Sequence, residues 1–289
     1  MTLTEDQVAF FRREGYLVAE GVLASSDLEP VIAGYREWVD QRAEALLAEG
    51  KIADICAAAP FETRIGALTD QCSTAADGMD IMQARLRPVF ELLYNDPLLD
   101  AVSTLVGPNL TCNPIQHIRA KPPARVQQSG YYNVPWHQDA AVTWEEADST
   151  EIVTCWIALV DATVENGCME VLPRAFSQGY LPHHSGDGGT TIVPDRLPQT
   201  EPVAVPVRQG GIVFMHRCTP HRSTPNLSNG VRWSIDLRYQ PTGLPTGRPF
   251  HPEFEVRSES HQVEPNYDVW VQRWRDALEA SRGARWHRV

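Results

Sequence analysis

Residues 209–241 read QGGIVFMHRCTPHRSTPNLSNGVRWSIDLRYQP, two strand-like runs on either side of a loop that carries two histidines. The glycines predict a turn, and residues 212–215 predict a buried strand. In the second run, residues 231–240, polar and apolar side chains alternate, which is typical of a strand with two different faces. The polar face carries Arg232, Ser234, Asp236 and Arg238. If this face lines the interior of a barrel, Arg232 is a buried cation that needs an anionic partner.

The rest of the central sequence has the same strand-rich character. From about residue 109, short β-branched or aromatic runs are separated by Gly, Pro, Asn and Asp. Such a pattern favours a sandwich or barrel, so we predict a mainly β fold with its core at 109–242. The stretch 183–200 is too polar and too rich in Gly and Pro for either a helix or a strand. The strands expected in the core are 111–121, 151–160, 168–172, 203–208, 211–216 and 231–240.

Helices are predicted before and after this core in the sequence. Residues 1–108 form a mostly helical N-terminal scaffold with one short strand at 16–19, and residues 243–289 form a C-terminal extension. The extension ends in a helix at about 266–285, where Trp270 and Trp274 share one face. We expect the whole chain, 1–289, to be a single domain. The N-terminal helices are expected at about 4–14, 26–50, 79–94 and 97–106.

Composition excludes several classes of protein. The chain has 289 residues and a formal net charge of −12, which argues against nucleic-acid binding. No apolar run is long enough to span a membrane, and the opening residues lack the features of an export signal. The six cysteines form no CxxC pair and are expected to be reduced thiols. We therefore expect a cytoplasmic monomer or homodimer that acts on a small molecule, without a membrane or nucleic-acid partner.

A possible metal site lies in residues 134–141, VPWHQDAA. His137 and Asp139 stand at i and i+2, so in extended backbone their side chains share one face. One imidazole and one carboxylate are part of the facial triad that binds Fe(II), and the second histidine must come from elsewhere. His216 and His221 both lie in the downstream loop and are candidates. His-x-Asp alone is a weak signal, because such pairs arise often by chance.

Together these segments resemble the phytanoyl-CoA dioxygenase (PhyH-like) family of Fe(II)/2-oxoglutarate oxygenases, which includes ectoine hydroxylase. The resemblance rests on WHQD at 136–139, on residues 156–176 and 210–241, and on the opening LTEDQVAFFRREGYLV. It implies a double-stranded β-helix, the jelly-roll core of cupin-like proteins, with helices packed on one side. Where the family usually has a Pro-Gly-Ser-His turn, residues 173–176 read PRAF.

The resemblance also implies roles for particular residues. His137, Asp139 and His221 match the iron ligands, and His216 is a weaker candidate for the distal ligand because its spacing to Arg232 fits less well. Arg232 matches the arginine that binds the far carboxylate of 2-oxoglutarate, with Ser223 as a helper. Asn133 and Thr154 are expected near the same co-substrate. Candidate substrate contacts are Gln116, His117, Arg119 and Trp144.

The implied activity is that of a dioxygenase that uses Fe(II), 2-oxoglutarate and O2. It would oxidise, most simply by hydroxylation, an unactivated C–H bond of a small organic molecule and release succinate and CO2, in natural-product or specialised metabolism. Two alternatives stay open: a non-catalytic sensor of the same fold that binds 2-oxoglutarate or metal, and a cupin-like metalloenzyme without redox chemistry. The second would not need Arg232. No residue identifies the substrate or the position that is oxidised.

Overall fold

The computed structural model describes residues 2–127, 132–186 and 188–288, and its centre is an antiparallel sheet. β11 (Arg232–Pro241) is the longest strand, and all of it except Pro241 is buried. β3 (His117–Lys121) pairs with the first half of β11. The remaining strands of the larger sheet follow in the order β1 (Tyr16–Ala19), β9 (Ile212–His216), β4 (Val153–Ala158), β11, β2 (Leu110–Cys112) and β12 (Phe254–Arg257).

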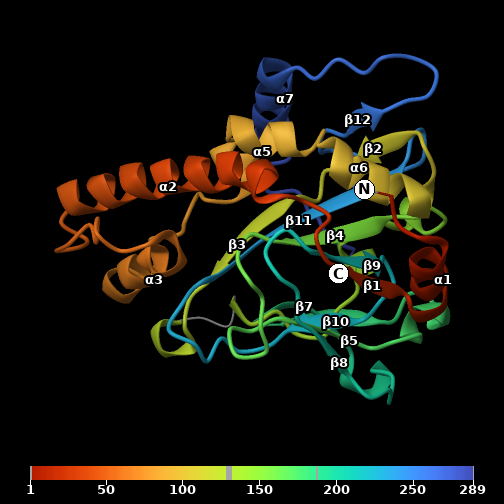
Figure 1. The fold of residues 1–289 in the computed structure, drawn as a ribbon, viewed down its shortest axis with the longest axis horizontal. Coiled ribbons are helices and arrows are strands. Elements are labelled where there is room, and N and C mark those ends of the chain that lie inside the picture. Colours follow the sequence, from red (N-terminus) through yellow and green to blue (C-terminus); the bar gives the residue numbers. More distant parts are fainter. Residues whose placement is uncertain (1, 128–131, 187, 289) are drawn as a thin grey trace.

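A smaller sheet lies against one face of this larger sheet. Its order is β10 (His221–Ser223), β5 (Met169–Val171) and β8 (Val203–Val205). An apolar cluster joins the two sheets, with Trp156 from β4 and Met169 from β5 among its members. β6 (His183–Gly186) and β7 (Gly189–Ile192) form a separate hairpin. The two facing antiparallel sheets form the predicted jelly-roll core (Figure 1).

Helices cover the opposite face of the larger sheet (Figure 1). The largest apolar cluster lies between them and that sheet, and the indole of Trp233 stacks on Phe61 with ring centroids 4.4 Å apart. In the described part of the chain, no helix is long and apolar enough to cross a membrane. The helices are α1 (Glu5–Glu14), α2 (Ser25–Ala48), α3 (Phe61–Gln71), α4 (Ile81–Ala84), α5 (Arg87–Leu92), α6 (Asp96–Val106) and α7 (Tyr267–Ala280). Short 3-10 turns occupy 124–126, 139–142, 145–147, 175–178 and 194–196.

The strands β10 and β12 were not predicted from the sequence. The structure differs from the sequence-based expectations in four further places. The strand expected at 111–121 is interrupted at 113–116, where the buried amide of Asn113 donates hydrogen bonds to Gln240 and to the carbonyl of Thr246. The helix expected at 79–94 breaks at Arg85, whose φ of 48° is left-handed. The helix at Phe61–Gln71 was not predicted.

The fourth difference is the segment 183–200, which contains the β6–β7 hairpin instead of only irregular loop. Tertiary contacts explain how so polar a segment forms strands. The Nε2 atom of His183 accepts a hydrogen bond from the backbone N–H of Gln138, and the N–H of Ile192 donates to the carbonyl of Trp136. The hairpin is therefore held against the 136–138 segment by contacts that local composition does not reveal.

Truncation of Trp233 tests whether β11 depends on the helical layer. Trp233 is fully buried, so Trp233→Ala leaves a cavity between sheet and helices and is expected to cost about 3–5 kcal/mol of unfolding free energy. Urea unfolding followed by circular dichroism measures this change. The matched control is Leu227→Ala at an exposed position, expected to change stability by less than about 0.5 kcal/mol. Equal effects of the two substitutions would contradict the assigned packing.

Candidate active site

A backbone bridge brings the two predicted histidine ligands together. The N–H of His137 donates to the carbonyl of His221, and the N–H of His221 donates to the carbonyl of His137, each at 3.0 Å. Asp139 follows at the start of a 3-10 turn. Ligand atoms of His137, Asp139 and His221 all lie within 4.8 Å of one another. Among the described residues, no other group of three His, Cys, Asp or Glu side chains is this close.

Backbone carbonyls fix the orientation of both imidazoles. Nδ1 of His137 donates to the carbonyl of Pro135, and Nδ1 of His221 donates to the carbonyl of Thr219, both at 2.9 Å. The Nε2 atom of each histidine lies 3.9 Å from Oδ1 of Asp139. Burial and the neighbouring His221 lower the pKa of His137 to about 3, so this ring is neutral, which is the form that binds a metal.

Asp139 is held as a carboxylate by its neighbours. Arg238 on β11 donates from Nη2 to Oδ1 at 2.8 Å and from Nε to Oδ2 at 3.1 Å, and the hydroxyl of Thr154 also donates to Oδ2. Burial alone would raise the pKa of Asp139, but the charge and hydrogen bonds of Arg238, together with the neighbouring His221 and His137, hold the pKa well below its ordinary value. Thr154 therefore contacts the carboxylate directly and also lines the cavity, and its expected place near the co-substrate stays a prediction.

Two neutral imidazoles and one carboxylate on one side of a point are the donor set of the facial triad, which suits Fe(II). The donors present here fit that ion, because each histidine has one nitrogen anchored and the other directed toward Asp139. His216 does not belong to this group. Its Nδ1 atom accepts a hydrogen bond from the N–H of Cys218, and its ring packs on Phe176.

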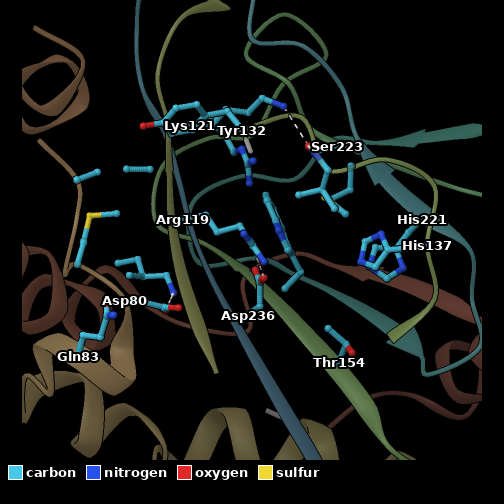
Figure 2. A pocket seen from close by; sticks show the side chains of 18 of the residues that line it. Asp80, Gln83, Arg119, Lys121, Tyr132, His137, Thr154, His221, Ser223 and Asp236 are labelled. Atoms are coloured by element: carbon cyan, nitrogen blue, oxygen red, sulfur yellow. Dashed lines mark hydrogen bonds and ion pairs between the residues drawn. The ribbon is translucent and has the colours of Figure 1, made fainter. Parts of the chain in front are cut away.

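His137 and His221 of the triad line a cavity of about 770 Å³. In Figure 2, His137 and His221 lie at one end and Asp80 and Gln83 at the other. Trp156, Met169 and Met215 contribute apolar wall, while polar side chains of β3 and β11 form much of the rest. A cavity of this size holds a drug-sized ligand, so one space can take a co-substrate and a small substrate together.

Two buried cations line this cavity without a carboxylate partner in the described part of the chain. Arg232 is 2% exposed; it donates to Ser234 at 2.8 Å, and its Nε atom has no hydrogen-bond partner there. Lys121 lies opposite Arg232 in the β3–β11 register and donates to Ser223 at 3.1 Å and to the carbonyl of Thr224. Burial, then the nearby Arg232 and Arg119, lower the pKa of Lys121 to about 7. Burial also lowers the pKa of Arg232, to about 10.

Because unpaired buried charge is costly, these groups fit an anionic ligand such as a dicarboxylate. This is the environment that the sequence predicts for Arg232. Ser223 lines the same part of the cavity and accepts the Lys121 hydrogen bond. Asn133, expected near the same ligand, does not line the cavity, and its amide donates to Gln127 instead.

The candidate substrate contacts are distributed less evenly. Arg119 lines the cavity and donates to Asp236 at 3.1 Å. Gln116 is fully buried and donates to Cys112 and to the carbonyl of Asn113. His117 pairs with Asp80, and Trp144 packs on Phe250 at the surface. Gln116, His117 and Trp144 therefore lie outside the cavity lining.

Several lining residues were not assigned from the sequence. Asp236 and Arg238 belong to the alternating polar face of 231–240, and Lys121 lies opposite Arg232 on β3. Strand register decides which of these side chains meet, and sequence alone does not give it. The wall formed by 69–83 was also missed, because that segment was assigned only to the scaffold.

A jelly roll that gathers such a triad and a buried arginine around one cavity defines the class of non-haem iron oxygenases that use 2-oxoglutarate with Fe(II) and O2. Residues 11–234 match the family described as phytanoyl-CoA dioxygenase (PhyH). The chain belongs to this family.

Similar proteins support the same assignment. Phytanoyl-CoA dioxygenase domain-containing protein 1 of Rattus norvegicus is 28% identical over 199 residues, which cover 57% of this chain and 61% of the relative. Its homologue in Dictyostelium discoideum is 22% identical and is matched over 92% of its length, with 83% of this chain covered. The chain thus spans only about three-fifths of the rat relative.

Solved structures agree in fold. The non-haem monooxygenase ThoJ superposes with a TM-score of 0.66 at 19% identity, covering 97% of this chain and all of that one. The epimerase SnoN, in complex with Fe3+, α-ketoglutarate and a nogalamycin compound, gives 0.57 at 22% identity, covering 91% and 92% of the two chains.

Replacement of Arg238 tests its role behind the carboxylate. Arg238→Met removes both hydrogen bonds to Asp139, and loss of such a partner typically weakens metal binding about 10- to 100-fold. Anaerobic titration with Fe(II) measures the affinity, and circular dichroism verifies folding. Arg208→Met, at an exposed position, is the control. Fe(II) affinity that is unchanged in Arg238→Met would show that the guanidinium does not position this carboxylate.

Proposed function

We propose that the protein is an Fe(II)- and 2-oxoglutarate-dependent dioxygenase that hydroxylates an unactivated C–H bond of a small organic molecule, releasing succinate and CO2. One observation carries the proposal: His137 and His221 of the metal cluster line the cavity that also contains Arg232, which has no carboxylate partner among the described residues. A metal site alone would serve many reactions. A metal site beside a buried cation fits a reaction whose co-substrate is a small dianion.

In this proposal His137, Asp139 and His221 hold the metal. The bound iron supplies the oxidising chemistry, together with O2 and 2-oxoglutarate. The protein keeps both imidazoles in one tautomer through the carbonyls of Pro135 and Thr219. Arg238 keeps the carboxylate ionised and oriented before any ligand arrives. Preorganised ligands of this kind need no rearrangement when metal binds.

The far carboxylate of 2-oxoglutarate is assigned to Arg232, with Lys121 and Ser223 beside it. A planar guanidinium can grip a carboxylate through two parallel N–H bonds, and Lys121 adds a second positive charge. An anion here would also restore the pKa of Lys121 toward its ordinary value, because it compensates the desolvated ammonium. The surrounding apolar wall of Trp156 and Met215 excludes water from the reacting centre.

The remaining end of the cavity, toward Asp80 and Gln83, is assigned to the substrate. The rat relative is named for phytanoyl-CoA, and SnoN is an epimerase of nogalamycin biosynthesis. We place this protein with enzymes of specialised metabolism, because its polar cavity fits a functionalised small molecule better than a plain hydrocarbon chain.

Removal of a metal ligand tests the proposal directly. We expect His137→Ala and Asp139→Ala each to abolish formation of succinate from 2-oxoglutarate in the presence of Fe(II) and O2. The reason is that each leaves two protein ligands for the metal. Succinate is measured by mass spectrometry, and unfolding curves check the fold. His261→Ala, at an exposed position, is the control. Activity like that of the unmodified protein in either ligand variant would refute the triad.

Arg232→Ala tests the co-substrate site. Loss of a charge-assisted pair is expected to raise the KM for 2-oxoglutarate about 10- to 100-fold. Arg125→Ala, at an exposed position, should leave the KM unchanged. A normal KM in Arg232→Ala would favour a metalloenzyme that does not use 2-oxoglutarate. Succinate formation at varied 2-oxoglutarate provides the measurement.

A further inference from the structure

The charged residues that line the cavity differ in how they are paired. Arg232 and Lys121 have no carboxylate partner among the described residues. Arg119 is paired with Asp236 at 3.1 Å, and the Asp80 carboxylate, at the end of the cavity away from the histidines, is paired with His117 at 2.8 Å. Figure 2 shows the Arg119–Asp236 pair between the histidines and the Asp80–Gln83 wall. The unpaired positive charge is therefore concentrated where 2-oxoglutarate is assigned.

The opening of the substrate end adds no positive charge. Its described lining residues from 69–83 are neutral or acidic, with Ser73, Asp77, Gly78 and Gln83 exposed. Once a dianion occupies Arg232 and Lys121, every lining cation of the described chain has a negative partner, since Arg238 is bound to Asp139. A phosphate group at this end would face Asp77 and Asp80 without an arginine or lysine to receive it.

Asp236 supplies a specific signal for a hydrogen-bond donor. The residue is 5% exposed and lines the cavity, and Oδ2 accepts from Arg119. The other oxygen, Oδ1, is buried and has no hydrogen-bond partner within the described residues. A buried carboxylate oxygen without a donor costs free energy, so a ligand that donates to it gains affinity. Hydroxyl and N–H groups are the donors that a small molecule offers.

We propose that the substrate is an uncharged small molecule with a hydroxyl or N–H group that donates to Asp236, and that phosphate-bearing molecules, including coenzyme A thioesters, are excluded by charge. This inference rests on the proposed function only in assigning Arg232 to 2-oxoglutarate. Asp236 is then a specificity-determining residue. Its pairing with Arg119 neutralises a guanidinium that would otherwise attract anionic groups.

Matched probes that differ only in phosphate test the charge rule. The pairs are S-octanoyl pantetheine with S-octanoyl 4′-phosphopantetheine, and phenyl glucoside with its 6-phosphate. Calorimetric titrations use the full chain loaded with Ni(II) and 2-oxoglutarate, which prevents turnover. In at least one pair the neutral member should bind about tenfold or more tightly than its phosphorylated partner. Phosphorylated members that bind as tightly, or no binding by any neutral member at millimolar concentration, would overturn the proposal.

Substitution of Asp236 separates a specificity role from a structural one. Asp236→Asn leaves Arg119 without its anionic partner Asp236, so the preference for the neutral probe should fall about tenfold or reverse. Asp236→Glu keeps the charge and should retain the preference, as should Asp268→Asn at an exposed helix position. An unchanged preference in a folded Asp236→Asn protein would contradict the assignment. If Asp236→Asn does not fold, loss of the preference in Asp236→Glu would contradict the assignment.

Failure of this inference and failure of the proposed function give different results. Succinate formation with Fe(II) and O2 reports only on the function, whereas the titrations with Ni(II) report only on ligand charge. Succinate formation triggered by a phosphorylated probe would leave the function intact and refute the substrate class. Selective binding of neutral probes by a protein that forms no succinate would support the substrate class and refute the function.

Discussion

Two reciprocal backbone hydrogen bonds between His137 and His221 hold the site together. They join the segment after 132 to the first residue of β10, so residues distant in sequence present their imidazoles to one point. Every other feature of the metal end follows from this bridge. Asp139 is carried toward both rings by the same short segment, and Arg238 meets it from β11. A metal ligand set formed this way is fixed by main-chain geometry as well as by side-chain packing.

The second constraint is the burial of a polar strand face. Arg232, Ser234, Asp236 and Arg238 are all at most 5% exposed, although such residues normally face water. Each charge on this face is paired differently. Arg238 forms an ion pair with the metal ligand Asp139, and Asp236 forms one with Arg119, whereas Arg232 has no carboxylate partner in the described chain. The strand thus divides the cavity into a region that requires an incoming anion and a region that is already neutral.

The sequence predicted the architecture well and the site in part. Alternation in 231–240 and turn residues in the core identified the strands, because a period of two survives in any sheet. The metal cluster followed from the spacing of His137 and Asp139 together with family resemblance. Gln116 and Trp144 could not be excluded, since the break in the strand at 113–116 and the packing of Trp144 on Phe250 are tertiary effects. Lys121 was missed because its role depends on its register with Arg232.

Both outer strands of the larger sheet come from outside the 109–242 core. β1 covers β9 on one side, and β12 covers β2 on the other. A version trimmed to the core would expose two rows of unsatisfied amides, which invite intermolecular pairing and amyloid-like association. The terminal segments consequently cover the sheet edges against intermolecular pairing, and shortened forms of this protein should be designed to retain them.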